Sequence, residues 1–464
     1  MILGQSAIAA TSASKDGITW NFSSDRPVGQ YCNGDWWVVG PVTITSITPE
    51  SVTVSATDRL GNAIQWTKNG TMVNPPPSYV SAAQGFDSSI YNFAGWSPER
   101  NKAPSFTGQP LIVPAGTSVL SSVSKSTPCT NTSNPQLEVM AVLTVVSAPP
   151  PTGSFRPSVV GNDKTHFWNK NQLNYSILRK LIPVANTPTL PEVEGYFDKH
   201  WVTVHEGNSV QVISPIQNMP KYGRDQAHLV SVGLLSLNLN YTDTQKEKLD
   251  IRMVQYGIDI YGATKIGQIW TDGGGQNNGR KAPLLLAGMA LNDMGMLEWA
   301  NGSKRVTNKF GYPVQPFAED SQTWVVGQSD VGRYVDNSDP ARPRVTYDQT
   351  HVGMPEWGER HATFPQLDTS TWGVGTTYRW IGGAQLGCAL AFRLMPNGMS
   401  AWNHPVFFDY GDRYWSIEKI NPTWSAPNGI NPFVWQMYQT YRSEVAIVAP
   451  SNRPVVPIGL TVVP

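Results

Sequence analysis

The sequence predicts a multidomain β + α protein, in which an immunoglobulin-like antiparallel β-sandwich precedes an all-α domain. Residues 17–147 alternate apolar and polar positions in short segments rich in Val, Ile, Thr and Trp, with turn residues between them. After residue 160 apolar residues recur every three or four positions, which is the period of an α-helix. Three prolines at 149–151 separate the two patterns, because proline cannot continue a central strand.

Several short strands within about 130 residues are typical of a sandwich that supports another domain. The segments expected to form strands are 36–49, 51–58, 63–70, 110–124 and 137–150.

The helical pattern predicts a ring of paired helices with a loop-lined mouth, and a plain helical bundle is the competing arrangement. The segments expected to be helical are 171–182, 190–205, 223–239, 243–265, 280–293, 382–395, 402–418 and 432–444. Thr242 followed by Gln245 is a capping box that marks the start of the fourth helix. We therefore expect a sandwich domain over 1–148, a linker over 149–160, a helical domain over 161–450 and a tail over 451–464.

Composition narrows the class of protein. The 34 Lys and Arg residues balance the 34 Asp and Glu residues, which argues against nucleic-acid binding. There is no run of 18 apolar residues, so no membrane span is expected. The small residues of the N-terminal segment fit either the remnant of a trimmed signal peptide or a disordered arm, and the first alternative favours a secreted or periplasmic protein. The oligomeric state is left open.

Aromatic and metal-binding residues give further indications. The 17 Trp and 17 Tyr residues suit either stacking on sugar rings or core packing. The seven histidines show no zinc-binding spacing, so no cofactor is expected, although a structural divalent cation is left open. Cys32 and Cys129 could form a disulfide, and Cys388 is expected to be buried.

The segment Gly-Gly-Gly-Gln-Asn-Asn-Gly-Arg-Lys, residues 273–281, precedes an apolar helix. It is not a phosphate loop, because Lys281 stands where that motif needs Ser or Thr. Cations in the first turn of a helix are unfavourable, so Arg280 and Lys281 require an anionic partner, either a carboxylate of the protein or one of a substrate. The residues expected to contact a substrate here are Gln276, Asn277, Asn278, Arg280 and Lys281.

A second cluster lies in Gly-Met-Pro-Glu-Trp-Gly-Glu-Arg-His, residues 353–361. Titratable groups beside a tryptophan in a loop indicate the wall of an active site. Its candidate residues are Glu356, Trp357, Glu359, Arg360 and His361. Candidates from elsewhere in the chain are Tyr222, Arg224, Arg333 and His404.

A β-sandwich, a proline spacer and a helical domain with Gly-rich and aromatic loops resemble the layout of secreted bacterial polysaccharide-active proteins. In particular, segments 17–49, 272–291 and 353–362 make the chain similar in layout to polysaccharide lyases built on an (α/α) toroid. This resemblance implies a toroid or incomplete barrel for the second domain and a uronic-acid polysaccharide as the substrate.

The expected function is β-elimination, in which the uronate carboxylate is neutralised and a base removes the neighbouring proton. His361 is expected to be the base, oriented by Glu356 or Glu359. The Gly-rich loop, with Arg224, Arg333 and Arg360, would bind the anion, and Trp357 would stack on sugar as an exposed ring. Tyr222 and His404 are reserve proton donors.

Two alternatives remain. A glycoside hydrolase would use Glu356 or Glu359 as general acid, paired with Asp225 or Asp272. A non-catalytic carbohydrate-binding surface protein would use the cationic loop as an internal ion-pair anchor.

Overall fold

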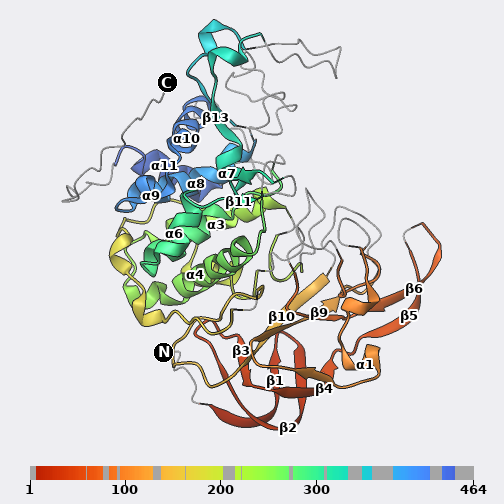
Figure 1. The fold of residues 1–464 in the computed structure, drawn as a ribbon. Helices are drawn as coiled ribbons and strands as arrows, with labels where there is room; N and C mark the ends of the chain where they lie inside the picture. Colours follow the sequence, from red (N-terminus) through yellow and green to blue (C-terminus); the bar gives the residue numbers. More distant parts are fainter. Residues whose placement is uncertain are drawn as a thin grey trace, which may run out of the picture.

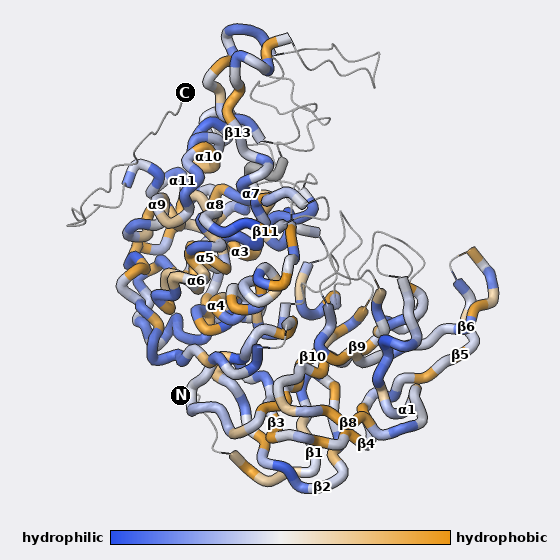
Figure 2. The backbone as a smooth tube through the Cα atoms, viewed as in Figure 1, coloured by the Kyte–Doolittle hydropathy of each residue, from blue (hydrophilic) through white to orange (hydrophobic). Residues whose placement is uncertain are grey.

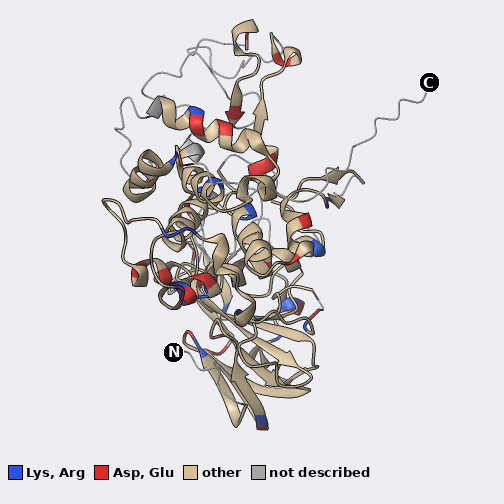
Figure 3. Cartoon of the chain, turned by 90° about the vertical axis from the view of Figure 1, so that its left-hand side faces the viewer, with Lys and Arg blue, Asp and Glu red and all other residues tan. Residues whose placement is uncertain are grey.

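The protein consists of a curled β-sheet at one end and a helical region at the other (Figure 1). This computed structural model describes residues 7–58, 60–76, 83–90, 95–128, 137–161, 163–201, 215–220, 222–270, 275–307, 311–332, 347–357, 380–418 and 431–444. Charged residues are sparse on the sheet and concentrate on the helices and loops (Figure 3).

One eight-stranded sheet forms most of the N-terminal region. Its strands are β1 (Ile8–Lys15), β2 (Ile18–Gln30), β3 (Trp36–Val39), β4 (Val42–Thr48), β7 (Thr71–Val73), β8 (Leu111–Val113), β9 (Thr117–Ser124) and β10 (Leu137–Val146). The order is β7-β9-β10-β3-β2-β4-β8, and β1 pairs with β2. A separate hairpin contains β5 (Val52–Thr57) and β6 (Ala63–Lys68). The predicted strand segments are confirmed.

The predicted immunoglobulin-like sandwich is wrong, because the strands form a curled half-barrel rather than two facing sheets. In particular, β3 and β10 pair in parallel, with Trp36 opposite Leu143. This pairing joins segments about a hundred residues apart, and alternation within each strand carries no information about it.

Strand β10 is buried on both faces. Ala141, Leu143 and Val145 point into the curled sheet, whereas Met140 and Val142 belong to the core shared with the helices. This alternation follows from the two-residue period of a strand. The sheet and the helical region therefore share a continuous hydrophobic core, in which apolar residues of β9 and β10 meet those of the helices (Figure 2).

Helices dominate the C-terminal region. They are α2 (Leu190–Tyr196), α3 (Gly223–Leu237), α4 (Asp243–Lys265), α5 (Lys281–Ala290), α6 (Met294–Ala300), α7 (Ala318–Ser321), α8 (Trp380–Leu394), α9 (Gly398–Trp402), α10 (Pro405–Glu418) and α11 (Pro432–Tyr441). The capping box of α4 is confirmed, since Thr242 and Gln245 exchange side-chain to backbone hydrogen bonds. The segment expected to be helical over 171–182 instead contains two 3₁₀ turns, Lys170–Gln172 and Tyr175–Ile177.

The predicted all-α toroid is also wrong. Helices of very different length pack irregularly, α3 on α8 and α4 on α5, and two small two-stranded sheets interrupt them. These sheets are β11 (Val306–Thr307) with β12 (Pro313–Val314) and β13 (Thr323–Val325) with β14 (Pro355–Trp357). A helical period identifies helices but does not determine which of them pack together.

Two glycines allow close helix contacts. A Cβ at Gly387 in α8 would lie 2.5 Å from the Ser231 side chain of α3. A Cβ at Gly257 in α4 would lie 2.3 Å from the carbonyl oxygen of Pro283 in α5. In the described part of the chain, no helix is both long enough and apolar enough to cross a membrane.

Candidate functional site

The Gly-rich loop meets an anion supplied by the protein itself. Arg280 is the N-cap of α5, and Oε1 of Glu319 accepts hydrogen bonds from the backbone N–H groups of Gly279, at 2.8 Å, and Arg280, at 3.2 Å. Lys281 forms an ion pair with Asp320 and donates to the carbonyl oxygen of Trp402 at 2.8 Å. Glu319 and Asp320 both belong to α7. Of the two anionic partners predicted for this segment, a carboxylate of the protein or one of a substrate, the structure therefore contains the first.

These loop residues are largely inaccessible. Asn278, Arg280 and Lys281 are at most 1% exposed, and Asn277 is 5% exposed. Oδ1 of Asn278 accepts a hydrogen bond from Gln385 at 3.2 Å, and Gln276 is half-buried. In this conformation the loop anchors α5 to α7.

His404 is the other candidate that the fold brings to this cluster. Its Nε2 lies 2.7 Å from Oγ1 of Thr323. Burial lowers the pKa of His404, while the charge of Asp320 opposes the shift and that of Lys281 adds to it. His404 thus lies within the electrostatic field of the Lys281–Asp320 pair. Asn403, the residue before it, ends α9 with a left-handed φ of 54°.

Glu356 and Trp357 occupy interior positions on β14. Glu356 is 0% exposed, and its carboxylate accepts hydrogen bonds from Nη1 of Arg413 at 2.7 Å and from the Tyr347 hydroxyl at 3.1 Å. Trp357 is also 0% exposed and packs against Phe407 and Tyr410. The expectation of an exposed, sugar-stacking ring at Trp357 is therefore wrong.

Tyr222 and Arg224 lie beside the Gly-rich loop at the start of α3. The guanidinium of Arg224 lies 5.2 Å from the centre of the Tyr222 ring and pairs with Asp225. Burial raises the pKa of Tyr222.

The candidates Arg333, Glu359, Arg360 and His361, together with Asp272 and Cys129, lie outside the described residues. Among the described residues, Cys32 and Cys388 are free and buried, and the predicted bridge from Cys32 to Cys129 stays a prediction.

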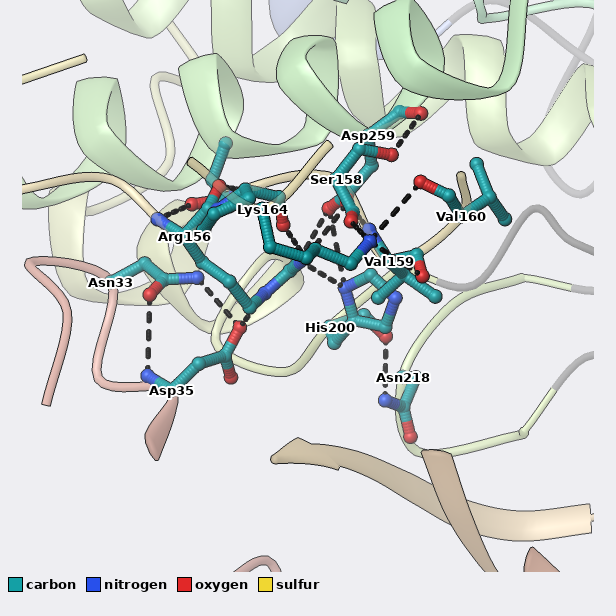
Figure 4. Close-up of polar contacts among 12 residues, drawn as sticks. Asn33, Asp35, Arg156, Ser158, Val159, Val160, Lys164, His200, Asn218 and Asp259 are labelled. Carbon is teal, nitrogen blue, oxygen red and sulfur yellow. Dashed lines mark hydrogen bonds and ion pairs between the residues drawn. The ribbon is translucent and has the colours of Figure 1, made fainter. Parts of the chain in front are cut away.

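The most extensive buried polar network lies where the sheet meets the helices (Figure 4). Arg156, 0% exposed, forms a bidentate ion pair with Asp259 of α4, at 2.9 and 2.5 Å. Its Nε donates to Asp35, which precedes β3, at 2.6 Å. Lys15 of β1 also pairs with Asp35. Burial alone would raise the pKa of Asp35, but the charges of Lys15 and Arg156 outweigh it and hold this pKa below its ordinary value.

His200 completes the network. Its Nδ1 lies 3.0 Å from Nη2 of Arg156. Because a guanidinium only donates hydrogen bonds, Nδ1 is the acceptor and the ring proton resides on Nε2. Burial lowers the pKa of His200 to about 4, against the attraction of Asp259, so the ring is neutral at pH 7. Among the described residues no group hydrogen-bonds to Nε2.

A small pocket, with a cavity volume of about 20 Å³, lies beside this network, and we call it the interface pocket. It is lined by Lys15, Asn33, Asp35, Phe197, Asp198, Lys199, His200, Trp201, Arg252, Gln255, Tyr256 and Asp259. The four lining residues of α4 are spaced i, i+3, i+4 and i+7, which places them on one face of the helix.

The hydrogen-bonding groups lining the interface pocket divide into two sets. Asp35 and Asp259 are saturated by Arg156, Lys15, Asn33 and the Val159 N–H. Gln255 exchanges both of its amide groups with the Arg156 backbone. Arg252 donates from Nη1 to the carbonyl oxygen of Glu194 at 2.6 Å, and its other nitrogens have no partner in the described part of the chain. Among the described residues, the ion-pair partner of Lys199 is Asp198, at 3.4 Å. The hydrogen-bonding groups of the pocket that remain available to a ligand are thus mainly donors, on Lys199, His200 and Arg252.

Sequence reasoning missed this site. Arg156 falls in the expected linker, and His200 stands in a segment that shows no metal-ligand spacing. Asp259 carried a usable signal, because it lies in an apolar stretch of α4 where an unpaired carboxylate would be costly. Within the described ranges, no three His, Cys, Asp or Glu side chains are grouped so as to hold a metal ion.

Comparison with known proteins adds no family to this description. No protein-family model, curated protein or solved structure matches the chain.

Proposed function

We propose that the protein binds an acidic saccharide whose carboxylate enters the interface pocket. The observation that carries this proposal is the donor character of the groups left unused there, Lys199, His200 and Arg252. A carboxylate accepts several hydrogen bonds and is bound best by charged donors, which Lys199 and Arg252 are, while the neutral His200 ring can donate one hydrogen bond. Phe197, Trp201 and Tyr256 add apolar surface to the same pocket.

We also propose β-elimination from a uronic-acid polysaccharide as the reaction of this pocket. Neutralisation of the carboxylate is the first requirement of that reaction, and the charges of Lys199 and Arg252 would supply it, with a hydrogen bond from His200. His200 is not assigned as the base, because its Nδ1 accepts from Arg156 and its Nε2 carries the ring proton. We assign abstraction of the C5 proton to Asp198, the lining carboxylate that the Arg156 network does not engage. The electron pair of that C–H bond forms the C4–C5 double bond, the bond from C4 to the glycosidic oxygen breaks, and the departing oxygen takes up a proton from water. A secreted or periplasmic location belongs to the same proposal.

Calorimetric titration of an oligogalacturonate, alongside the same oligosaccharide with its carboxyl groups reduced, tests the binding. We expect the acidic form alone to bind, and Arg252→Met to weaken it about tenfold, which corresponds to roughly 1.4 kcal/mol. Lys248→Met is the matched control, since Lys248 lies one turn away on α4, is paired with Glu194 and does not line the pocket. Equal binding of both oligosaccharides, or equal loss in both variants, would contradict the proposal.

Ultraviolet absorbance of the unsaturated product, with reducing ends assayed in parallel, tests the reaction separately. A rise in both signals that Asp198→Asn abolishes would support elimination. Reducing ends without absorbance would indicate hydrolysis. Binding without either signal would remove the catalytic part of the proposal and leave the binding part standing.

A further inference from the structure

A second pocket, with a cavity volume of about 140 Å³, lies on the adjacent face of α4, and we call it the aromatic pocket. It is lined by Pro157, Ser158, Val160, Gly161, Asp163, His166, Trp168, Ile258, Tyr261, Gly262, Lys265 and Ile266. Its α4 residues 258, 261, 262 and 265 again follow the i, i+3, i+4, i+7 spacing of one helix face.

The walls of the aromatic pocket are fixed from behind. The buried Lys164 ammonium donates to the carbonyl oxygens of Ser158, Val159 and Val160, so the chain folds around it. Ser158 lies so close to α4 that a Cβ at Gly262 would meet its Oγ at 2.1 Å. A ligand would therefore enter a preformed cavity with little ordering cost.

Three rings form one side of the cavity. The half-buried Trp168 lies between His166, at 4.3 Å between ring centres, and Tyr261, at 6.1 Å. Nε1 of Trp168 donates to Asp293 at 2.8 Å, which fixes the plane of the indole. Partly exposed aromatic rings held in this way offer an apolar face to a ligand that is itself partly apolar.

The charged groups on the rim cancel each other. Lys265 lies 3.7 Å from Oδ2 of Asp163, and its ammonium lies 4.9 Å from the centre of the Tyr261 ring. Oδ1 of Asp163 accepts from the backbone N–H groups of Thr165 and His166. A carboxylate and an ammonium side by side can accept from and donate to neighbouring hydroxyl groups, and they favour a ligand without net charge.

We infer that the aromatic pocket binds an uncharged pyranose ring. A pyranose combines an apolar C–H face, which suits the Trp168 indole, with hydroxyls for Asp163 and Lys265. A flat base fits less well, because neighbouring rings are inclined at 67° and 71° and form no parallel slot. A quaternary ammonium also fits less well, because Lys265 already occupies the face of Tyr261.

This inference does not rest on the proposed function, since it uses other residues and a neutral ligand. Saturation-transfer NMR and calorimetry with a panel of neutral pyranosides and their oligosaccharides test it. We expect a member of the panel to bind the full-length protein, and Trp168→Ala and Asp163→Asn each to weaken that binding about tenfold, equivalent to roughly 1.4 kcal/mol. Trp96→Ala is the matched control, as Trp96 is also half-buried but packs against Phe106 in the N-terminal region.

His166→Ala removes an exposed ring of the same pocket. It tests the inference if Trp168→Ala does not fold. Arg252→Met should leave this binding unchanged, which separates the two pockets. Absence of binding by the whole panel, or binding that survives Trp168→Ala, Asp163→Asn and His166→Ala, would overturn the inference. Binding of tetramethylammonium with loss in the same variants, and none of the sugars, would identify a cation cage and also overturn it.

Discussion

Arg156 and Asp259 form a bidentate ion pair in which both side chains are buried, 0% and 5% exposed. The pair joins the segment that leaves the sheet to the middle of α4. Asp35 extends it to the loop before β3. Groups of opposite charge from three separate parts of the chain thus determine how the sheet and the helices meet.

Removal of one partner should be costly because it leaves a buried charge without compensation. We expect Arg156→Met to lower the free energy of unfolding by about 3–5 kcal/mol. Urea denaturation followed by circular dichroism measures this change. Lys304→Met, which removes a cation from the exposed Lys304–Glu298 pair, should cost less than about 1 kcal/mol. Similar losses in the two variants would contradict the role of Arg156.

Asp320 should stabilise the fold rather than bind a substrate. Asp320→Asn leaves the Lys281 ammonium, 1% exposed, without its ion-pair partner, and we expect a loss of about 3–5 kcal/mol. Thermal unfolding and saccharide titration of the same preparation check both points. A variant of unchanged stability that no longer binds any saccharide would instead support the substrate-binding role first expected for this loop.

Asp250 should make the protein less stable as the pH rises. Burial raises the pKa of Asp250 to about 7, although Lys246 opposes the shift. The folded state therefore binds a proton that the unfolded state has released between pH 3.8 and about 7. Asp250→Asn removes this titration, so its advantage over the natural protein should grow from pH 4 to pH 7. Melting temperatures across this range, with the exposed Glu298→Gln as control, should show it.

His200 should act in the opposite direction. Its pKa of about 4 in the folded state lies below the ordinary 6.5, so the unfolded state binds a proton first as the pH falls. Stability is complete above pH 6.5 and is lost toward pH 4, by up to about 1.4 kcal/mol per pH unit. In His200→Gln we expect a shallower loss in urea titrations over this range. His166→Gln, at an exposed position, should keep the slope of the natural protein.

Local features of the fold were predictable, because short-range patterns encode them. Thr242 and Gln245 indicated the start of α4 since a capping box is completed within four residues. Pairing over long distances was not predictable in this way. The parallel alignment of Trp36 with Leu143 turns the expected sandwich into a half-barrel, and neither segment reveals its partner.

The same distinction between local and long-range features applies to the candidate site. The position of Arg280 and Lys281 at the start of a helix predicted that they need an anionic partner. It did not predict which residue supplies that anion. Glu319 and Asp320 lie about forty residues further along the chain, in a four-residue helix. Arg156 looked like part of a linker because its two carboxylate partners are each about a hundred residues away.

The two-sided burial of β10 has a consequence for how the chain is made. When residues 137–146 leave the ribosome, α3 and α4 have not yet been translated, so the face bearing Met140 and Val142 has no cover. An apolar strand surface exposed in this way is prone to aggregate. The nascent chain must stay shielded until roughly another hundred residues have been added, and slow translation or a shortage of chaperones should lower the yield of soluble protein.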